Sequence, residues 1–513
     1  MMHLPLLPVL VPLVTAVLML AVHRADIRVA RGMAAMSLGG LGIAAILLLR
    51  QAGDGTVAAV SLGNWPAPFG IVFVADRLAV LMVATTTAIA VPALLAACGG
   101  LDRRGRYFHP FFQMQIAGLN GAFLTGDLFN LFVFFEVLLI ASYGLLVHGG
   151  GPARARAGMH YVVLNLVGSI IFLIALGLLY GMLGTLNMAD VAERLSVVPA
   201  ADAAPVRTAL VLLVAVFALK AALLPLGFWL PHAYGAAAAP TAALFAVLTK
   251  VGIYALIRLS SLALDAPPGA ALLSPWLLPV ALTTVAVATA GALSAVRLGT
   301  VVAHLLLLST GMLAAALAEG GVPMMAALLY YLPHTTLVSA ALFLLVAQIA
   351  AARGHSGDRL VREAPMPGRA WLGASFMVLA VAVTGLPPLS GFLGKVMLLG
   401  AAPPNAAGYA LWVVFILSGF VAALGLARAA STLFWERAAP AENPPVPAPP
   451  APRGWAGPVA LVLALGFVPA LVLGAAPLSA YARAAAEQLA AREPYLRAVL
   501  PAGAAAVARE VRP

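Results

Sequence analysis

Lysine is almost absent from this sequence. Of the 29 basic residues, three are lysine and the other 26 are arginine. The three are Lys220, Lys250 and Lys395, and each lies inside a long apolar run, whereas nearly every arginine lies between such runs. A codon bias explains the preference for arginine. It does not explain why the three exceptions fall where a charge is most costly.

Cysteine and charge are scarce as well. The single cysteine, Cys98, excludes an intramolecular disulfide and any CxxC metal or redox site, and we interpret it as a small buried hydrophobe. Charged residues make up 9% of the 513 residues, against about 25% in soluble domains, and 63% are hydrophobic. Many runs reach the roughly 20 apolar residues that cross a bilayer. The sequence therefore predicts an all-α polytopic membrane protein.

The apolar runs predict about fourteen transmembrane helices. They begin near residues 4, 33, 72, 108, 128, 161, 208, 239, 272, 300, 324, 371, 409 and 455. The first run lacks a preceding basic segment and a convincing cleavage site, so we expect a retained helix whose N-terminus lies outside. Arginine-rich segments such as DRRGR and RGHSGDRLVREAPMPGR then fall in cytoplasmic loops, as the positive-inside rule requires. Both termini are expected outside, and the net charge of +11 reflects this pattern rather than nucleic-acid binding.

Two segments near the C-terminus differ from the rest. Residues 438–454 are rich in proline and lack core-forming residues, which indicates a cytoplasmic linker of polyproline type, with a binding role for the prolines as the alternative. Residues 455–513 then hold the last transmembrane helix and a tail. The tail alternates Ala and Leu with Arg and Glu, so we expect an amphipathic helix at the outer, periplasmic interface.

Helix breakers occur at mid-depth in two predicted spans. Pro225 and Gly227 follow Lys220 in the seventh span, and the segment GLPPLSG precedes Lys395 in the twelfth. Broken helices in a membrane are tolerated where they are buried in protein or line a wet cavity, and paired broken helices indicate a transport site. The lysine precedes the break in one span and follows it in the other, which is compatible with inverted repeats.

A lysine in this environment is suited to carrying protons. Intramembrane charges usually mark an ion or proton path. Burial lowers the pKa of a lysine in general and a nearby carboxylate raises it again, whereas arginine stays protonated. Glu136, in the fifth span, is the best candidate partner for Lys220. A static buried ion pair is the alternative, although such pairs stabilise a fold poorly compared with apolar packing.

Further titratable residues extend this series. We interpret Lys250 as an intermediate proton site, with snorkelling to an interface as the alternative, and Lys395 as the terminal site. His304 and His334 lie in apolar helices and are candidates to connect these two lysines, or else ordinary core residues. His232 is expected at a water-accessible mouth. Asp127 is the expected N-cap of the fifth span.

Nothing in the sequence indicates a catalytic nucleophile, a phosphate-binding loop or a metal cage. We therefore predict no cofactor, no metal and no enzymatic activity of the chain itself.

The residues described so far resemble a known family. TGDLFNLFVFFEVLLIASYGLL, ALKAALLPLGFWLPHAYGAAAAPTAALFAVLTKVGIYALIR and TGLPPLSGFLGK are similar to segments of the antiporter-like subunits shared by Mrp-type Na⁺(K⁺)/H⁺ antiporters and respiratory complex I. The sequence of the first segment is most similar to that of the D-type subunit of the Mrp (Mnh, Pha) complex. The resemblance covers most of spans four to thirteen.

The resemblance implies a fourteen-helix fold with inverted five-helix repeats, broken helices 7 and 12, and both termini outside. The N-terminal helices would occupy residues 1–106, the first repeat 107–262 and the second, inverted repeat 270–437. The family's functional residues correspond to Glu136, Lys220, Lys250 and Lys395. Many relatives carry a further lysine on helix 11, where this chain has Ser339, and helix 10 has VVAHLLLLSTG in place of a serine-rich segment. The connection between Lys250 and Lys395 would then depend on His334, His304 or water.

The function implied is proton translocation by the D-type subunit of a multisubunit Na⁺ or K⁺/H⁺ antiporter. Its expected partners are the other antiporter subunits, the lipid bilayer of a bacterial inner membrane, H⁺, and Na⁺ or K⁺. One alternative is the proton-pumping membrane subunit of a complex I-like oxidoreductase or a membrane hydrogenase. Another is a non-conducting scaffold.

Overall fold

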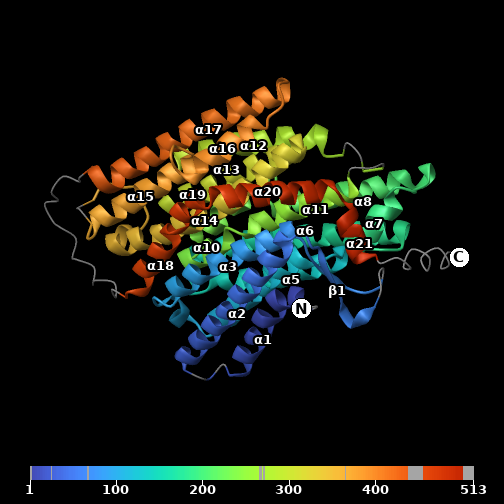
Figure 1. The fold of residues 1–513 in the computed structure, drawn as a ribbon. Helices are drawn as coiled ribbons and strands as arrows, with labels where there is room; N and C mark the ends of the chain where they lie inside the picture. Colours follow the sequence, from blue (N-terminus) through green and yellow to red (C-terminus); the bar gives the residue numbers. More distant parts are fainter. Residues whose placement is uncertain are drawn as a thin grey trace.

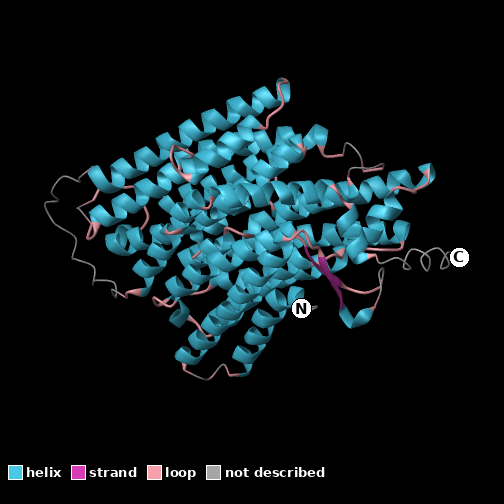
Figure 2. Cartoon of the chain, viewed as in Figure 1, coloured by secondary structure: helices cyan, strands magenta, loops and turns pink. Residues whose placement is uncertain are grey.

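The computed structural model describes residues 3–22, 24, 26–65, 69–264, 268–269, 272–363, 366–436 and 454–500. Within these ranges the chain is nearly all helical, and the exception is one short hairpin (Figure 2). Twelve of the described helices are long and apolar enough to cross a membrane. The prediction of a polytopic helical membrane protein is confirmed. The predicted proline-rich linker, residues 438–454, falls almost entirely outside the described residues.

The elements follow one another along the chain as in Figure 1. The helices are α1 (Leu7–Ala21), α2 (Ile27–Gly53), α3 (Arg77–Ala97), α4 (Phe108–Leu124), α5 (Leu128–Val147), α6 (Pro152–Leu183), α7 (Met188–Leu195), α8 (Ala203–Lys220), α9 (Trp229–Ala236), α10 (Ala239–Phe245), α11 (Leu248–Ala263), α12 (Ser274–Ser294), α13 (Leu298–Glu319), α14 (Val322–Arg353), α15 (Arg369–Thr384), α16 (Ser390–Gly400), α17 (Ala406–Ala430), α18 (Ala456–Leu465), α19 (Phe467–Leu473), α20 (Ala475–Ala490) and α21 (Glu493–Val499). The strands are β1 (Ala58–Ser61) and β2 (Val72–Ala75). Short additional turns include η3 (Leu101–Arg104).

Several helices begin at other residues than predicted. The third span was expected to begin near Val72, but Val72–Ala75 pairs with β1 as an antiparallel strand and the helix begins at Arg77. The reason is local: β-branched and aromatic residues favour the strand, and the Asp76 side chain accepts a hydrogen bond from the Ala79 amide at 2.9 Å as an N-cap. Helices α2 and α6 begin earlier than expected. Their first turns carry arginines, so the hydropathy pattern did not count these turns as part of an apolar run.

Two gaps between consecutive helices lie next to lysines. Helix α8 ends at Lys220 and α9 begins at Trp229, while α15 ends at Thr384 and α16 begins at Ser390. Proline has no amide hydrogen to continue the ladder, and both gaps contain proline. A third interruption was not predicted: the turn at residues 246–247 separates α10 from α11, and Lys250 lies in the first turn of α11. All three lysines therefore lie beside an irregular point in a helix.

The core surrounds α14, the long helix near the middle of Figure 1, which packs against α3, α10, α13 and α16. Helix α20, drawn in red, crosses α14 and also contacts α3 (Figure 1). Its buried residues, Ala482, Ala485, Ala486 and Leu489, recur every three or four positions and form one apolar face. Helix α20 therefore has an apolar face, and this face packs on protein.

Candidate functional site

Lys220 is the last residue of α8, and its amine points into the bundle. The side chain is 4% exposed. Its Nζ donates to the backbone carbonyl of Asn165 at 3.3 Å and lies 3.4 Å from Asn165 Oδ1 and 3.5 Å from Ser169 Oγ. Asn165 and Ser169 are one turn apart on α6, which packs directly against α8. The amine is thus held by uncharged oxygen atoms.

Glu136 reaches Lys220 through a hydroxyl rather than by direct contact. The Ser169 hydroxyl donates a short hydrogen bond to Glu136 Oε1 and lies beside the Lys220 amine. In the described part of the chain, no carboxylate lies within 4.0 Å of any lysine amine. The expectation that Glu136 lies directly beside Lys220 was therefore too simple. Helix α6 packs between α5 and α8, so a side chain of α6 separates the two charges, although they still interact electrostatically.

Aromatic rings cover one side of the Lys220 amine. The Phe135 ring lies 5.8 Å from Nζ, at cation–π distance. Phe135 is in turn stacked against Phe217, and both rings contact Phe172 edge-on. This arrangement excludes bulk water from the amine on the side of these rings while leaving the polar face toward α6.

Lys250 is fully buried, and among the described residues its amine bonds to hydroxyl groups. Its Nζ donates to Ser309 Oγ at 3.1 Å and to Thr310 Oγ1 at 3.2 Å, both on α13. Each hydroxyl also donates to the carbonyl of Leu306, at 2.7 and 3.0 Å respectively. The amine thus points across to α13 inside the bundle, which excludes snorkelling to an interface.

A glycine brings the Lys220 and Lys250 regions together. A Cβ atom on Gly252 would lie 2.4 Å from the backbone nitrogen of Ala221 and 2.8 Å from the backbone carbon of Lys220. Such distances are incompatible with any side chain, so the first turns of α11 touch the end of α8 through bare backbone. The two lysine-bearing segments are therefore in direct contact.

Lys395 bonds to the end of the helix that precedes it. Its Nζ donates to the carbonyl of Thr384, the last residue of α15, at 2.6 Å. His334 of α14 lies at the same break, with Nδ1 2.9 Å from the Oγ of Ser390, the first residue of α16. Its ring is buried, stacks on Tyr331 with 5.6 Å between centroids, and interacts electrostatically with Lys395. The structure thus brings His334 and Lys395 together.

His304 and His232 belong to a different group. The Nδ1 of His304 lies 2.9 Å from the Thr300 carbonyl one turn earlier, and its ring fills the space over Gly291 on α12. His304 interacts electrostatically with His232, which is exposed, and neither histidine hydrogen-bonds Lys250 or Lys395. The hypothesis that His304 joins these lysines is not supported by these contacts. The role of His232 at a water-accessible mouth stays a prediction.

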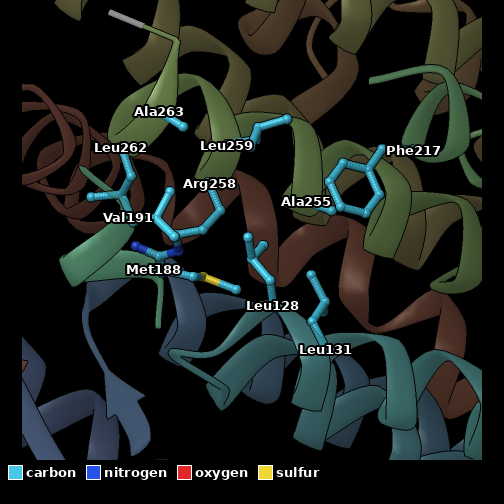
Figure 3. A pocket seen from close by; sticks show the side chains of 10 residues that line it. All are labelled: Leu128, Leu131, Met188, Val191, Phe217, Ala255, Arg258, Leu259, Leu262 and Ala263. Atoms are coloured by element: carbon cyan, nitrogen blue, oxygen red, sulfur yellow. The ribbon is translucent and has the colours of Figure 1, made fainter. Parts of the chain in front are cut away.

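The other end of α11 carries a buried ion pair. Arg258 donates to both carboxylate oxygens of Asp76, at 2.7 and 2.9 Å. Figure 3 shows Arg258 beside a small pocket whose other lining residues, such as Leu128, Met188 and Phe217, carry no titratable group. This pocket therefore adds no proton-carrying residue to the lysines. The described residues contain no group of three or more His, Cys, Asp or Glu side chains that could hold a metal ion.

The partners of the lysines were missed by the sequence analysis. They are Asn165, Ser169, Ser309 and Thr310, together with the backbone carbonyl of Thr384. One signal was present for the first two, since Asn165 and Ser169 are an i,i+4 polar pair in an otherwise apolar helix.

Comparisons with known proteins point to one family. The family described as "NADH:quinone oxidoreductase/Mrp antiporter, TM" matches residues 125–422. The D-type subunit of a probable K⁺/H⁺ antiporter of Rhizobium meliloti (strain 1021) is 40% identical over 468 residues, covering 84% of this chain and 87% of the relative. The D-type subunit of an Na⁺/H⁺ antiporter of Bacillus subtilis (strain 168) is 34% identical over 503 residues, covering 96% and 99%.

Solved structures show the same fold. A chain of the Mrp complex from Dietzia sp. DQ12-45-1b superposes with a TM-score of 0.85 at 28% identity, covering 98% of this chain and 100% of that one. A chain of an archaeal membrane-bound sulfane sulfur reductase gives a TM-score of 0.87 at 24% identity, covering 98% and 100%. At that identity, the second likeness concerns the fold alone.

Proposed function

The chain belongs to the NADH:quinone oxidoreductase/Mrp antiporter family, and we propose that it is the proton-translocating D-type subunit of a multisubunit Na⁺ or K⁺/H⁺ antiporter. The proposal extends to this chain what the names of its relatives state. It includes fourteen membrane spans, two inverted repeats at residues 107–262 and 270–437, and both termini outside a bacterial inner membrane. Sister subunits are its partners, and it requires no cofactor.

One observation supports this function above the others. Three lysines are buried beside helix interruptions, and each amine bonds to neutral oxygen atoms with no carboxylate within 4.0 Å in the described chain. A lysine in a tight ion pair is held in its charged form, whereas one surrounded by hydroxyl and carbonyl groups can give up its proton. Lone intramembrane charges of this kind mark ion paths.

The groups form a sequence of steps through the bundle. Glu136, Ser169 and Lys220 make the first, and backbone contact at Gly252 leads to Lys250 with its two hydroxyl partners. Lys395 and His334 make the last, at the second broken helix. Movement of a proton along these groups would be driven by the membrane potential, which supplies about 2.3 kcal/mol per charge per 100 mV.

The test uses the complete gene cluster in an antiporter-deficient host, with assembly checked by blotting. Inverted vesicles are energised to form a pH gradient, and Na⁺ or K⁺ is added to dissipate it. We expect the wild type to respond and assembled Lys220→Ala to fail. Lys220→Arg, which cannot release its proton, should fail too. Arg207→Gln, an exposed change on the same helix, should respond normally.

The outcome also separates the alternatives. An assembled Lys220→Ala complex that responds like the wild type would mean that the lysines are not the path, and would favour a scaffold. If the gradient depends on an electron donor and no cation dissipates it, the chain is the membrane subunit of a redox-driven pump instead.

A further inference from the structure

A second buried polar cluster lies away from the lysines, where α3 ends and α4 begins. Its centre is the fully buried carboxylate of Asp102. Arg31 of α2 donates to both oxygens, with Nε at 2.7 Å and Nη2 at 2.9 Å. His109, in the first turn of α4, places Nε2 3.1 Å from the same carboxylate. This arrangement is a buried carboxylate with one permanent cation and one titratable partner.

The charge of this cluster is defined by its geometry. Burial by itself raises the pKa of Asp102, but hydrogen bonds from His109 and Arg31 lower that pKa to about 2. Asp102 is therefore ionised at neutral pH, and its charge is balanced by Arg31. An imidazole can hold a hydrogen on one nitrogen or on both, and a second hydrogen on His109 would give the cluster a net positive charge.

Two buried atoms near this cluster lack partners among the described protein atoms. They are His109 Nδ1 and Gln113 Nε2. The two residues are four positions apart on α4 and therefore face the same side, with side chains one turn apart. Gln113 Oε1 accepts a hydrogen bond from Ser37 of α2 at 2.9 Å, which leaves the amide nitrogen as the unpartnered atom. When His109 donates from Nε2 to Asp102, Nδ1 is an acceptor, whereas the Gln113 amide is a donor.

The acceptor atom of His109 and the donor group of Gln113 suit one bridging water molecule. A water placed between the two side chains would accept from the amide of Gln113 and donate to Nδ1 of His109. Buried water typically makes two to four such bonds to groups that would otherwise be unpaired. The same face of α4 continues to Asn120, which donates to the Pro8 carbonyl at 2.9 Å and whose Oδ1 also lacks a partner. Unpartnered buried polar atoms therefore recur on the face of α4 that meets α1 and α2.

Other titratable groups near His109 do not neutralise this site. His148, at the end of α5, interacts electrostatically with both His109 and Asp102. Burial lowers the pKa of His148, which favours its neutral form. The Cys98 carbonyl accepts from Arg31 Nη2 at 2.7 Å and contributes structure to the cluster. Asp102, Arg31 and His148 are thus the charged or titratable groups that face His109.

We propose that Asp102, His109 and Gln113 form a hydrated proton-binding site, separate from the lysines, in which one water molecule joins His109 Nδ1 to the Gln113 amide. The proton arrives from the aqueous side, where the adjoining turn exposes Arg103 and Arg104, and binds to Nδ1 through this water. Protonated His109 then donates from both nitrogens, to Asp102 and to the water, which reorients to accept.

The site responds to pH at one end of the bundle. This end carries DRRGR and is the one predicted to face the cytoplasm. The site can therefore report the cytoplasmic proton concentration to α2 and α4 without belonging to the transport path. This inference does not depend on which cation is exchanged.

The experiment uses the whole complex labelled with ¹⁵N-histidine. The chain has nine histidines, so the imidazole signals of His109 are identified by their loss in His109→Asn. Solid-state NMR spectra are then compared from about pH 5 to about pH 8, the range in which histidine titrates. We expect wild-type His109 to change from one protonated nitrogen to two on acidification.

Variants then test the water and the carboxylate. Gln113→Leu removes a partner of the bridging water, so the protonated form loses an acceptor and the titration midpoint should fall by about one pH unit, a tenfold change. Ser37→Ala loosens Gln113 and should lower the midpoint less. His160→Gln is the control, because it removes an exposed histidine that bonds to the Arg156 carbonyl of its own helix, α6, and should leave the His109 spectrum unchanged.

The result that would overturn the proposal is equally specific. If Nδ1 of His109 stays unprotonated through the whole range, in the wild type and in Gln113→Leu alike, the cluster serves packing only. If His109 titrates but the midpoint is the same in Ser37→Ala and Gln113→Leu as in the wild type, the water bridge is excluded. Where Gln113→Leu fails to assemble, Ser37→Ala alone decides between these outcomes.

Discussion

Lys220 and Lys395 lie beside corresponding breaks in two helices, yet their surroundings differ. The Lys220 amine shares the hydroxyl of Ser169 with Glu136, so a carboxylate lies one hydrogen bond beyond its own partner. The Lys395 amine bonds to the carbonyl at the C-terminal end of α15, and its titratable neighbour is a buried histidine. One lysine is linked to a carboxylate through a hydroxyl group, while the other faces the negative end of a helix dipole.

This difference assigns separate roles to the two breaks. A carboxylate can change its charge or move, and either event alters the affinity of Lys220 for a proton. A backbone carbonyl at a helix end does neither, so it stabilises a cation by a constant amount. We infer that a carboxylate controls the proton affinity of Lys220, whereas a helix end and a buried histidine set that of Lys395. Variants at each break test this contrast.

The largest effect is expected from Glu136→Gln. The change keeps the shape and a hydrogen-bond acceptor for Ser169, but removes the charge that interacts with Lys220. We expect cation-dependent proton transport to fall by at least about tenfold, equivalent to about 1.4 kcal/mol, measured as the rate of gradient dissipation in vesicles. Transport within about twofold of the wild type would mean that Lys220 and Lys395 are controlled alike.

A somewhat smaller effect is expected from Gly385→Ala at the other break. Gly385 has φ +79°, and a Cβ there would lie 2.6 Å from Lys395 Cδ. Backbone strain at residue 385 and displacement of the Lys395 side chain should together reduce transport by about fivefold and destabilise the complex by about 1–2 kcal/mol. Gly400→Ala on α16, the helix that carries Lys395, is the control, because a Cβ there would meet nothing within 4 Å.

The Lys220 region offers a direct counterpart to that change. A Cβ on Gly168 would lie 3.0 Å from a Leu219 methyl group and 3.7 Å from Lys220 Cε. Gly168→Ala should therefore disturb its lysine less than Gly385→Ala does, as seen in transport rate and thermal stability. If the two changes are equally harmful, the contrast between a crowded Lys395 and a less crowded Lys220 is wrong.

A moderate effect is expected from Ser169→Ala. The hydroxyl links Glu136 to Lys220, and without it the two charges still interact through space. We expect transport to fall by about threefold, the effect of one buried hydrogen bond, with recovery in Ser169→Thr. Ser375→Ala is the matched control, since its hydroxyl bonds only to the Trp371 carbonyl of its own helix. Full activity in Ser169→Ala would show that the hydroxyl is not part of the path.

Ser169 also shows what could not be predicted from the sequence alone. The buried lysines, and the breaks beside Lys220 and Lys395, followed from composition and from proline and glycine positions, because these act along the chain. Ser169 was not selected, because small hydroxyl residues are common in membrane helices and the space between α5 and α8 is visible only once the helices are packed. The same applies to His304, which lies in an apolar helix as His334 does but faces α12.

The break before Lys250 was missed for a related reason. The segment ALFAVLTK contains neither proline nor glycine, so nothing in it interrupts a helical pattern. The helix is interrupted where it packs against the end of α8, a contact made possible by Gly252. Tertiary packing therefore overrides the local preference for a helix at this position. At the other two breaks, proline in the sequence already interrupts the helix.

The smallest effects are expected at Lys250, whose two hydroxyl partners can substitute for each other. Ser309→Ala or Thr310→Val alone leaves one hydrogen bond to the amine, at 3.2 or 3.1 Å. Each should reduce transport by less than about twofold, whereas the double variant should lose more than the product of the two, since residues that share a partner are not additive. The measurement is a double-mutant cycle on vesicle transport rates, with Thr289→Val as control because its hydroxyl bonds only to its own helix. Strict additivity would mean that the two hydroxyls act independently, and Lys250 would then be held by something other than this pair.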